Sequence, residues 1–306
     1  MASLAGPRIE TSDLHAAGWT QPPGSRWVEY TVPKPRVLPE VQWMDREPNV
    51  NPTIARIALA SDTVQGDVRP QVTQGIYLAE TTRRALMGRS RDESGLPSRL
   101  FSGKDEDGRP LRGHQHAFFL TCDDDEDGRI DHLLVYVRGG MGHRELEAIA
   151  GIKKLWQVRH KPDLFPVLVG MGQAEEFGSN QPGMPGRTRL LGRSRYWSSA
   201  TPYLLTRHPK KNGKESPAEQ LRRDLERMGL PEPVGIEQMP DGRPTRRKTF
   251  RWLEFARERQ TGGKPPAQAL GYGFRITFDE PVTGPIALGY GAHFGLGTFV
   301  AEEDKG

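Results

Sequence analysis

Cysteine is almost absent from this chain of 306 residues. The one cysteine, Cys122, excludes an intrachain disulfide framework and a zinc site with several cysteine ligands. No apolar run approaches the roughly 20 residues that cross a bilayer. The first residues also lack the basic segment and apolar core of a signal peptide. We therefore expect a cytoplasmic protein without a membrane partner.

Three common catalytic motifs are missing too. The sequence holds no P-loop, no HExxH and no GxSxG, so nothing in it supports nucleotide hydrolysis, zincin chemistry or α/β-hydrolase chemistry. Glycine and proline, in contrast, are abundant. The 35 glycines and 26 prolines are well above their usual combined share of about 12% of a chain. This excess predicts many turns and argues against a helical bundle.

Charge is nearly balanced in total but unevenly distributed. The 43 Lys and Arg exceed the 39 Asp and Glu by a net charge of +4. Acidic residues concentrate at 123–131, and basic residues at 187–195, 207–214 and 243–251. Aromatic residues accompany the basic runs, and aromatic rings among cations suit single-stranded RNA, which offers phosphates and unstacked bases. A solvated basic surface explains the same pattern.

The first half predicts a ferredoxin-like unit. Its apolar patterns indicate, in order, strand, helix, strand, strand, helix and strand. Two helices then cover one face of a four-stranded antiparallel sheet, and the other face is expected to be open for RNA. The predicted elements are strand 53–60, helix 69–86, strands 115–121 and 130–137, helix 143–156 and strand 165–171, with a polar loop at 88–112.

The second half repeats this plan imperfectly, with the second helix reduced or missing. Helix 216–228 has a serine cap, Ser216, followed by proline and by glutamate three residues on. The strands are expected at 196–205, 234–238, 248–255 and 273–278. The predicted fold class is α+β, with two tandem ferredoxin-like (RRM-like) domains at 51–177 and 178–306. The second is irregular and carries a glycine-rich loop, and residues 1–50 form an extended arm or linker with one strand at 26–32.

Two histidines, His114 and His116, stand at the start of the strand predicted at 115–121. Residues i and i+2 on a strand point to the same face, so both imidazoles are expected to project together. Such a pair suits proton transfer, with one ring taking and one giving a proton. Metal ligation, or two polar residues on a solvated strand face, are the alternatives.

An acidic turn separates the strands predicted at 115–121 and 130–137. Carboxylates at its positions 1, 3, 5 and 9, with Gly128 at position 6, match the spacing of a calcium loop. Position 12 is Leu134 instead of the bidentate glutamate of an EF-hand. A structural calcium and a turn that binds nothing both remain open. The candidate ligands are Asp123, Asp125, Asp127 and Asp131.

Four glycines alternate around a third histidine, His293, near the end of the chain. Exposed amides in such a loop can cradle phosphate oxygens, and a tight hairpin that needs glycine for its shape is the alternative. A strand follows the loop where a dinucleotide fingerprint requires a helix, which excludes that motif. The four glycines are Gly289, Gly291, Gly295 and Gly297.

Three separated motifs together resemble a known family. They are His114-Gln-His-Ala-Phe-Phe119, Asp123-Asp-Asp-Glu-Asp-Gly-Arg-Ile-Asp-His132 with Leu-Leu-Val after it, and Gly289-Tyr-Gly-Ala-His-Phe-Gly-Leu-Gly297. In this order they resemble the type I-G (formerly I-U) CRISPR-associated fusion subunit of the RAMP superfamily. The resemblance covers about residues 50 to 301, the carboxy-terminal, repeat-cleaving endoribonuclease part. The family's amino-terminal capping domain is thus expected to be missing or supplied by another chain.

The resemblance implies binding of CRISPR repeat RNA and metal-independent cleavage of precursor crRNA. The ribose 2′-OH attacks the adjacent phosphate and leaves a 2′,3′-cyclic phosphate, with no cofactor for catalysis. The product is kept for assembly with other type I effector complex subunits. Related nucleases often place their histidine near the first helix, but residues 69–86 contain none. The expected catalytic residues are therefore His116 and His114, then His293.

RNA contacts are expected from the glycine-rich loop and from the basic runs. Phosphate contacts are assigned to Arg246, Arg247 and Lys248, and further RNA contacts to His208, Lys210 and Lys211. A non-catalytic RNA-binding subunit of a CRISPR effector complex uses the same fold and loops without any histidine. A calcium-stabilised structural protein built on the acidic turn is the second alternative.

Overall fold

The computed structural model describes residues 11–18, 51–61, 69–111, 113–155, 163–209, 215–261 and 265–304. The chain divides into two compact units, residues 1–49 and residues 50–306. The first contains helix α1 (Thr11–Ala16), inside the segment predicted as an arm. The strand predicted at 26–32 lies outside the described residues, as do Lys210 and Lys211. Among the helices described, none combines the length and apolar composition of a membrane span.

The first sheet of the second unit follows the predicted plan. Its neighbouring strands are all antiparallel and lie in the order β2-β3-β1-β4. The element order and pairing are those of a ferredoxin-like unit, so the predicted α+β class with antiparallel sheets is confirmed. The elements are β1 (Ile54–Ser61), α2 (Gly75–Arg89), β2 (Phe118–Cys122), β3 (His132–Tyr136), α4 (His143–Ala150) and β4 (Leu164–Gly172).

A second, five-stranded sheet has the order β12-β13-β5-β11-β7. Four neighbouring strands of this sheet lie in the order β13-β5-β11-β7. The corresponding strands of the first sheet have the same order, β4-β1-β3-β2, when that sheet is followed from its β4 edge. Between β11 and β13 the chain forms the short strand β12 and a single-turn helix, η5, instead of a long helix. The elements are β5 (Arg193–Ser199), α5 (Pro217–Arg227), β7 (Gly235–Gln238), β11 (Phe274–Thr283), β12 (Ile286–Ala287), η5 (Ala292–Phe294) and β13 (Thr298–Ala301). The division into two domains near residue 177 stays a prediction.

Short elements connect the two sheets. Strands β6 and β10 pair with each other, and so do β8 and β9. Their bounds, with those of the short helices, are η1 (Val72–Gln74), α3 (Arg99–Ser102), η2 (Ala174–Phe177), η3 (Arg189–Leu191), β6 (Tyr203–Leu204), β8 (Gly242–Pro244), β9 (Thr249–Arg251), η4 (Trp252–Glu254) and β10 (Gly271–Tyr272).

Several element ends differ from the sequence prediction for local reasons. Residues 69–71 are not helical, because Gln71 pairs with Arg129 of the acidic turn and the Val72 N–H bonds the Gly128 carbonyl. The strand predicted at 196–205 is broken before β6, at Pro202, which has no N–H for a ladder. The strand predicted at 248–255 ends at residue 251 and continues as η4. The cap of α5 is as predicted, since the Glu219 N–H donates to Ser216 Oγ.

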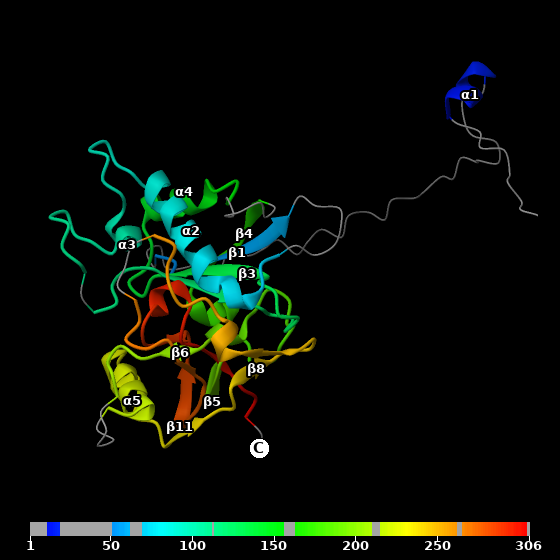
Figure 1. The fold of residues 1–306 in the computed structure, drawn as a ribbon. Helices are drawn as coiled ribbons and strands as arrows, with labels where there is room; N and C mark the ends of the chain where they lie inside the picture. The colour runs from blue at the N-terminus through cyan, green and yellow to red at the C-terminus, as the bar shows by residue number, and fades with distance from the viewer. Residues whose placement is uncertain are drawn as a thin grey trace, which may run out of the picture. The chain divides into compact units, whose positions relative to one another are not determined.

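Both faces of the first sheet are covered. Phe119 packs in the cluster beneath α2 and α4, whereas Phe118 and Leu120 point the other way, into a cluster with Trp197 and Tyr203 of the second half. Figure 1 shows α2 and α4 on one side of this sheet and β5, β6 and β11 on the other. The prediction of an open sheet face for RNA is therefore wrong. Burying each large side chain there stabilises the fold by about 1.5–3 kcal/mol, which favours burial of this apolar face over exposure.

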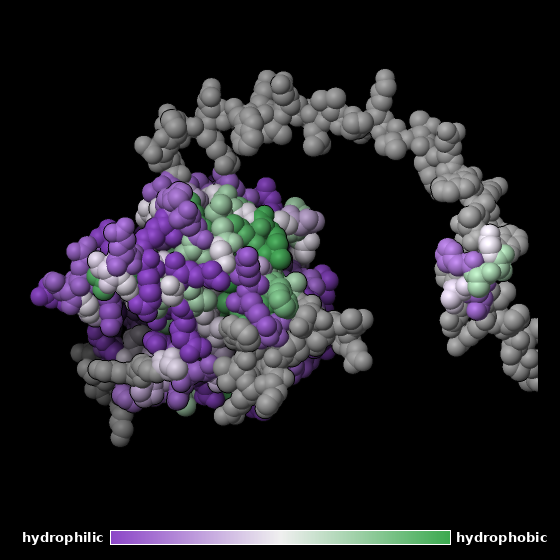
Figure 2. Space-filling model, turned by 90° about the horizontal axis from the view of Figure 1, so that it is seen from above, coloured by the Kyte–Doolittle hydropathy of each residue, from purple (hydrophilic) through white to green (hydrophobic). Residues whose placement is uncertain are grey.

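Strand β4 ends the first sheet and carries an exposed apolar row. Val167 and Val169 are each 51% exposed and Met171 is 41% exposed. The pairing of β4 with β1 shifts register within this row, at Val169, so the three side chains do not all share one face of the strand. Figure 2, seen from above, shows hydrophobic side chains gathered in one place on a mostly hydrophilic face.

Candidate active site

The first two histidines lie just before β2 instead of on it. The strand begins at Phe118, and His114 has a left-handed backbone with φ of 54°, next to Gly113 at 69°. The expectation that both side chains project from one strand face is therefore wrong. The Ala117 N–H bonds the Leu100 carbonyl, so the segment is held against α3.

The glycine-rich loop is a compact turn that carries His293 on η5. Its four glycines all have left-handed backbones, with φ values of 80°, 73°, 78° and 59°, which side chains other than glycine rarely adopt. A side chain at Gly297 would collide with the Leu288 carbonyl, and one at Gly289 with the Leu204 carbonyl. Several loop amides bond to carbonyls of the chain itself, among them those of Tyr290 and Gly297. The glycines thus shape the turn, and their predicted contact with RNA stays a prediction.

The three predicted histidines come together from two distant segments. His114 Nδ1 lies 3.1 Å from His293 Nε2, and His293 Nδ1 lies 3.1 Å from the Ala117 carbonyl oxygen. The His116 ring stacks on the His293 ring at a centroid distance of 3.7 Å, and Phe118 stacks on His293 at 3.9 Å. We call His114, His116 and His293 the histidine trio.

The hydrogen bonds fix the proton positions on two of the three neutral rings, those of His293 and His114. A carbonyl oxygen only accepts, so His293 Nδ1 carries a hydrogen and donates to Ala117. His293 Nε2 is then an acceptor, and His114 Nδ1 donates to it. The lone pair of His114 Nε2 is left for another partner. His116 Nδ1 is buried and has no hydrogen-bond partner among the described residues.

The environment favours the neutral form of all three rings. Burial lowers the pKa of His116 to about 4, with help from His114 and Arg83, and lowers the pKa of His293 to about 3, with help from His116. Burial and Arg138 also lower the pKa of His114, although Asp224 acts against them. Near neutral pH the three rings are therefore neutral, so none of them is an imidazolium that can donate a proton, and the lowered pKa values also make them weaker bases than free histidine.

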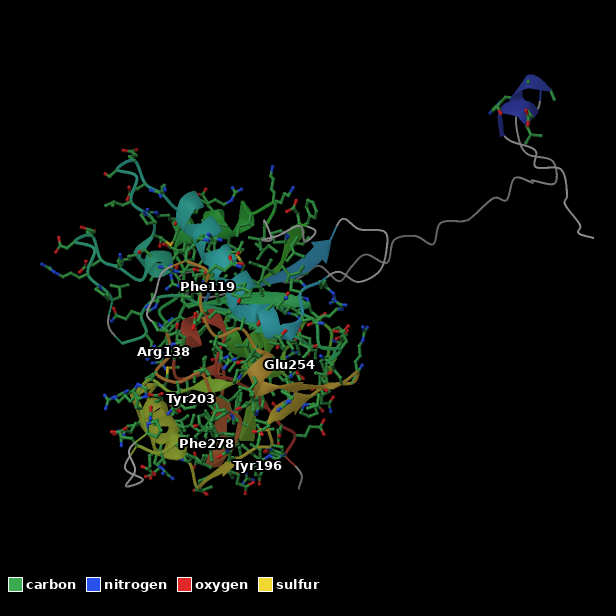
Figure 3. The ribbon with its side chains drawn as sticks, viewed as in Figure 1. Phe119, Arg138, Tyr196, Tyr203, Glu254 and Phe278 are labelled. Carbon is green, nitrogen blue, oxygen red and sulfur yellow. The ribbon has the colours of Figure 1, made fainter. Side chains whose placement is uncertain are left out.

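A group of charged residues that the sequence analysis missed lies near His114. Asp224 of α5 accepts a hydrogen bond from the Tyr203 hydroxyl at 2.8 Å and pairs with Arg227 at 3.2 Å. Arg138 donates to the Met228 carbonyl at the end of α5; Figure 3 labels Arg138 and Tyr203. Arg138 follows the end of β3 by two residues, beyond the last pair of β2 with β3, and no pattern in the sequence marked it. No spacing signal pointed to Asp224.

The basic residues predicted to bind phosphate lie elsewhere. Residues 246–248 form the turn between β8 and β9, where Arg247 pairs with Asp127 at 3.2 Å and Lys248 pairs with Glu254 at 3.2 Å. Asp127 follows the carboxyl end of β2, whereas the histidines precede its amino end. A five-residue strand spans about 17 Å, so Arg246, Arg247 and Lys248 are not brought to the trio. His208 is exposed in the segment after β6.

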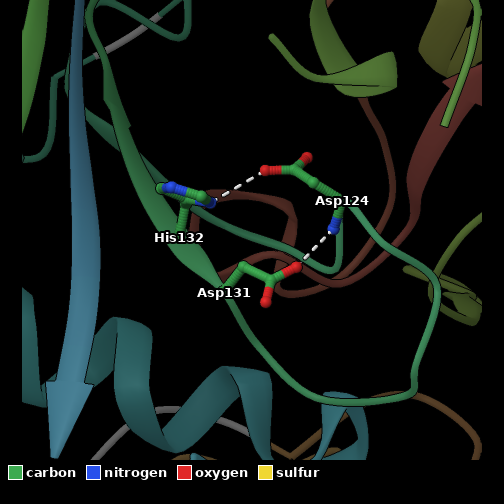
Figure 4. A group of neighbouring side chains, drawn as sticks. All are labelled: Asp124, Asp131 and His132. Carbon is green, nitrogen blue, oxygen red and sulfur yellow. Dashed lines mark hydrogen bonds and ion pairs between the residues drawn. The ribbon is translucent and has the colours of Figure 1, made fainter. Parts of the chain in front are cut away.

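The acidic turn contains two clusters instead of one set of four ligands. Asp123, Asp125 and Asp127 group together, whereas Asp131 groups with Asp124 and His132. In Figure 4, Asp124 pairs with His132 at 2.9 Å, and its N–H donates to Asp131 at 2.7 Å. The predicted structural calcium, with Asp131 among its ligands, stays a prediction.

Arginines neutralise much of this acidic turn. Arg56 pairs with Asp124 at 2.7 Å, Arg243 with Asp123 at 3.1 Å, and Arg69 with Asp131. Burial raises the pKa of Asp123 to about 6 despite Arg243. Burial acts in the same direction on Asp124, but hydrogen bonds from His132, Thr188 and Arg56 outweigh it and lower its pKa. Because Arg243 belongs to the second half, the turn also ties the two halves together.

Comparisons with known proteins found matches among solved structures only. No protein-family model matches the chain, and no curated protein matches it. A solved structure titled "Characterization of a Cas6-related gene from Pyrococcus furiosus" is 10% identical, with a TM-score of 0.39, over 83% of this chain and 100% of that chain. Another, titled "Csf5, CRISPR-Cas type IV Cas6 crRNA endonuclease", is 12% identical, with a TM-score of 0.32, over 82% of this chain and 98% of that one. At these identities and TM-scores the likeness carries no argument.

Proposed function

We propose that this chain is an endoribonuclease that binds CRISPR repeat RNA and cuts precursor crRNA through attack of a ribose 2′-OH, without a metal. The observation that carries the proposal is the histidine trio. His114 and His293, 179 residues apart, meet at 3.1 Å, and both belong to motifs that resemble the type I-G fusion subunit.

In this proposal His114 is the general base. Its Nε2 lone pair takes the proton of the 2′-OH, the 2′ oxygen bonds to phosphorus, and the bond from phosphorus to the 5′ oxygen breaks. The leaving 5′ oxygen takes a proton from water, and His114 afterwards returns its own proton to the solvent. The products are a 2′,3′-cyclic phosphate and a 5′-hydroxyl. General base catalysis of this kind contributes about 10²–10⁴-fold to a rate.

His293 is a positioning residue in this scheme. Both of its ring nitrogens are engaged, one with Ala117 and one with His114, so it fixes the tautomer and orientation of His114. His116 packs on its ring and so helps to hold its orientation. Arg138 is near enough to act electrostatically on His114, and it would stabilise charge on the phosphate.

The finer assignments belong to the same proposal. We place the chain in the type I-G branch of the RAMP superfamily, with two tandem ferredoxin-like domains. The cut RNA stays bound and assembles with other effector subunits in the cytoplasm. The motif order supports this assignment.

A non-catalytic RNA clamp is the second candidate, and one observation favours it. Protonation of the 5′ oxygen needs a proton donor, and the lowered pKa values of His116 and His293 make both poor donors near neutral pH. In the clamp, the trio packs the junction and the RNA stays intact.

Digestion of repeat RNA in EDTA separates these candidates. The enzyme is expected to yield fragments with a cyclic phosphate end, and the His114→Ala, His116→Ala double variant is expected to bind the RNA without cutting it. Intact RNA bound by the wild-type chain would favour the clamp. Cleavage by the double variant at the normal rate would remove both histidines from the mechanism.

A further inference from the structure

A cavity of about 620 Å³ lies between α2, the segment 92–108, Arg144 and Arg259. Its size falls within the range of about 300–1,000 Å³ that is common for small-molecule sites. Neither the glycine-rich loop nor the predicted phosphate contacts line it, so the expected RNA contacts leave its role unexplained.

Two arginines of the cavity lining face the same aromatic ring. The guanidinium carbons of Arg83 and Arg259 lie 5.8 Å and 4.9 Å from the centre of the Phe294 ring. Arg83 donates to the carbonyls of Phe101 and Ser102, and no carboxylate among the described residues forms an ion pair with it. Burial and the charge of Arg259 lower the pKa of Arg83. Two cations this close to one ring favour an anion beside them. Three carboxylates, those of Asp92, Asp105 and Glu106, line the cavity as well.

A buried carboxylate fixes Arg259 in place. Glu80 on α2 is 1% exposed and lies 3.4 Å from Arg259 Nε. It also accepts hydrogen bonds from the Gln260 N–H at 2.7 Å, the Thr261 N–H at 3.2 Å and the Thr261 hydroxyl at 2.8 Å. These bonds hold residues 259–261 against the helix. The second guanidinium is therefore positioned before any ligand arrives.

The cavity adjoins the histidine trio on two sides. Ser102 lines it, and a Cβ on the next residue, Gly103, would lie 3.2 Å from His116 Cδ2. Phe294, beneath both arginines, directly follows His293. An anion held by these arginines would thus sit beside the trio.

The cavity lining also has an apolar part. Met87, Leu96 and Pro97 belong to it, and Leu96 is 47% exposed. A pair of fixed cations beside an apolar wall matches a nucleotide, which has an anionic phosphate and a flat base.

We propose that this cavity binds one nucleotide of the RNA next to the cleaved bond, with Arg83 and Arg259 on its phosphate and the apolar wall against its base. This inference rests on the proposed function, since it takes the histidine trio as the cleavage site. The cavity would be a specificity site for the RNA, and it lies outside the basic runs that the sequence analysis singled out.

The test measures binding without cleavage. The probe is repeat RNA with 2′-O-methyl groups on every ribose, which cannot react through a 2′-OH. Its Kd is measured against salt for the wild-type chain, for Arg259→Gln, and for Arg84→Gln, a control that removes an exposed arginine of α2 outside the cavity. We expect Arg259→Gln to raise Kd about tenfold and to flatten the plot of log K against log salt by about 0.7, the loss of one single-strand phosphate contact. Arg84→Gln should stay within twofold of the wild type.

A phosphate scan provides the second measurement. Neutral methylphosphonates replace the RNA phosphates one at a time, and one position near the cleaved bond should weaken wild-type binding but have no further effect on Arg259→Gln. An unchanged Kd and slope, an equal loss in Arg84→Gln, or the absence of a sensitive phosphate would overturn the inference. So would Arg259-dependent binding of a polyglutamate peptide that displaces the RNA, because the cavity would then take an acidic protein segment. If Arg259→Gln does not fold, the scan on the wild-type chain decides.

The two proposals fail separately. A wild-type chain that leaves unmodified repeat RNA intact in EDTA, but shows the predicted Arg259 dependence, would refute the cleavage proposal and support the nucleotide site.

Discussion

His114 Nδ1 lies 3.1 Å from His293 Nε2, across 179 residues of sequence. The carbonyl of Ala117 orients His293, and His293 orients His114. This chain of hydrogen bonds leaves one imidazole nitrogen, His114 Nε2, with a lone pair for the substrate. The catalytic proposal depends on this relationship.

Replacing the proposed base should slow cleavage with little effect on RNA binding. We expect His114→Ala to reduce the single-turnover cleavage rate by about 10²–10⁴-fold, the usual contribution of a general base. His143→Ala is the matched control, because His143 is a histidine with an 86% exposed side chain at the start of α4. Equal rates for the two variants would exclude His114 as the base.

The pH dependence of cleavage should reflect a neutral histidine. The pKa of His114 is lowered from 6.5, mainly by burial, so its neutral form predominates above that pH. The single-turnover rate should therefore be flat from pH 6.5 to 8 and fall below an apparent pKa that is less than 6.5. A rate that declines steadily between pH 6 and 8 would instead indicate a required imidazolium acid.

Stability should also fall with acid through the same cluster. Burial lowers the pKa of His293 to about 3 in the folded state, while the unfolded chain keeps a value near 6.5. Between these two values the unfolded state binds more protons, so stability is complete above pH 6.5 and is lost as the pH falls toward 3. Below pH 6.5, the free energy of unfolding of the wild type should fall by up to about 1 kcal/mol per pH unit more than that of His293→Gln. Urea melts of both proteins at pH 7 and 5 measure this, and parallel losses would contradict it.

The sequence predicted much of the first sheet because its signals are local. The short apolar runs in β2 and β3 and the cap at Ser216 are read within a few positions. The start of β2 was misplaced because the left-handed backbone of His114 leaves no mark on hydrophobic periodicity. The buried second face of the sheet was missed although the unbroken apolar runs of β2 and β3 are typical of strands that are covered on both faces.

The candidate site could be predicted only in part for a related reason. Glycine and histidine marked His293 as unusual, but nothing local showed that it would meet His114. The roles of Arg83 and Asp224 arise from tertiary contacts between distant elements. The basic runs attracted attention by composition, yet Arg247 and Lys248 pair with acidic side chains.

Breaking the buried ion pair of the acidic turn should destabilise the fold. The Arg56 and Asp124 side chains are 5% and 11% exposed and lie 2.7 Å apart. Asp124→Asn would leave Arg56 without its carboxylate, at a cost of about 3 kcal/mol. Asp107→Asn, which breaks an exposed pair with Arg109, should cost under about 1 kcal/mol. Denaturant unfolding compares the two, and a similar small loss in both would show that the turn is not a structural tie.

A methyl group added in the glycine-rich turn should destabilise the fold by more than backbone strain alone would. Gly297 and Gly108 both have left-handed backbones, with φ of 59° and 78°, but only Gly297 is packed against the Leu288 carbonyl. Gly108→Ala should lower the free energy of unfolding by about 1 kcal/mol. Gly297→Ala should lower it several times more. Thermal melts test this difference. Equal losses would mean that the turn can relax, and its packing role would be refuted.

One deoxy substitution tests the central claim most directly. Repeat RNA with a single 2′-deoxyribose on the 5′ side of the cleaved bond keeps every phosphate and base but lacks the attacking hydroxyl. We predict that the wild-type chain binds this RNA normally in EDTA and does not cut it at that bond, whereas the all-ribose RNA is cut to a 2′,3′-cyclic phosphate. Cleavage of the deoxy RNA at the same bond would contradict the proposed mechanism.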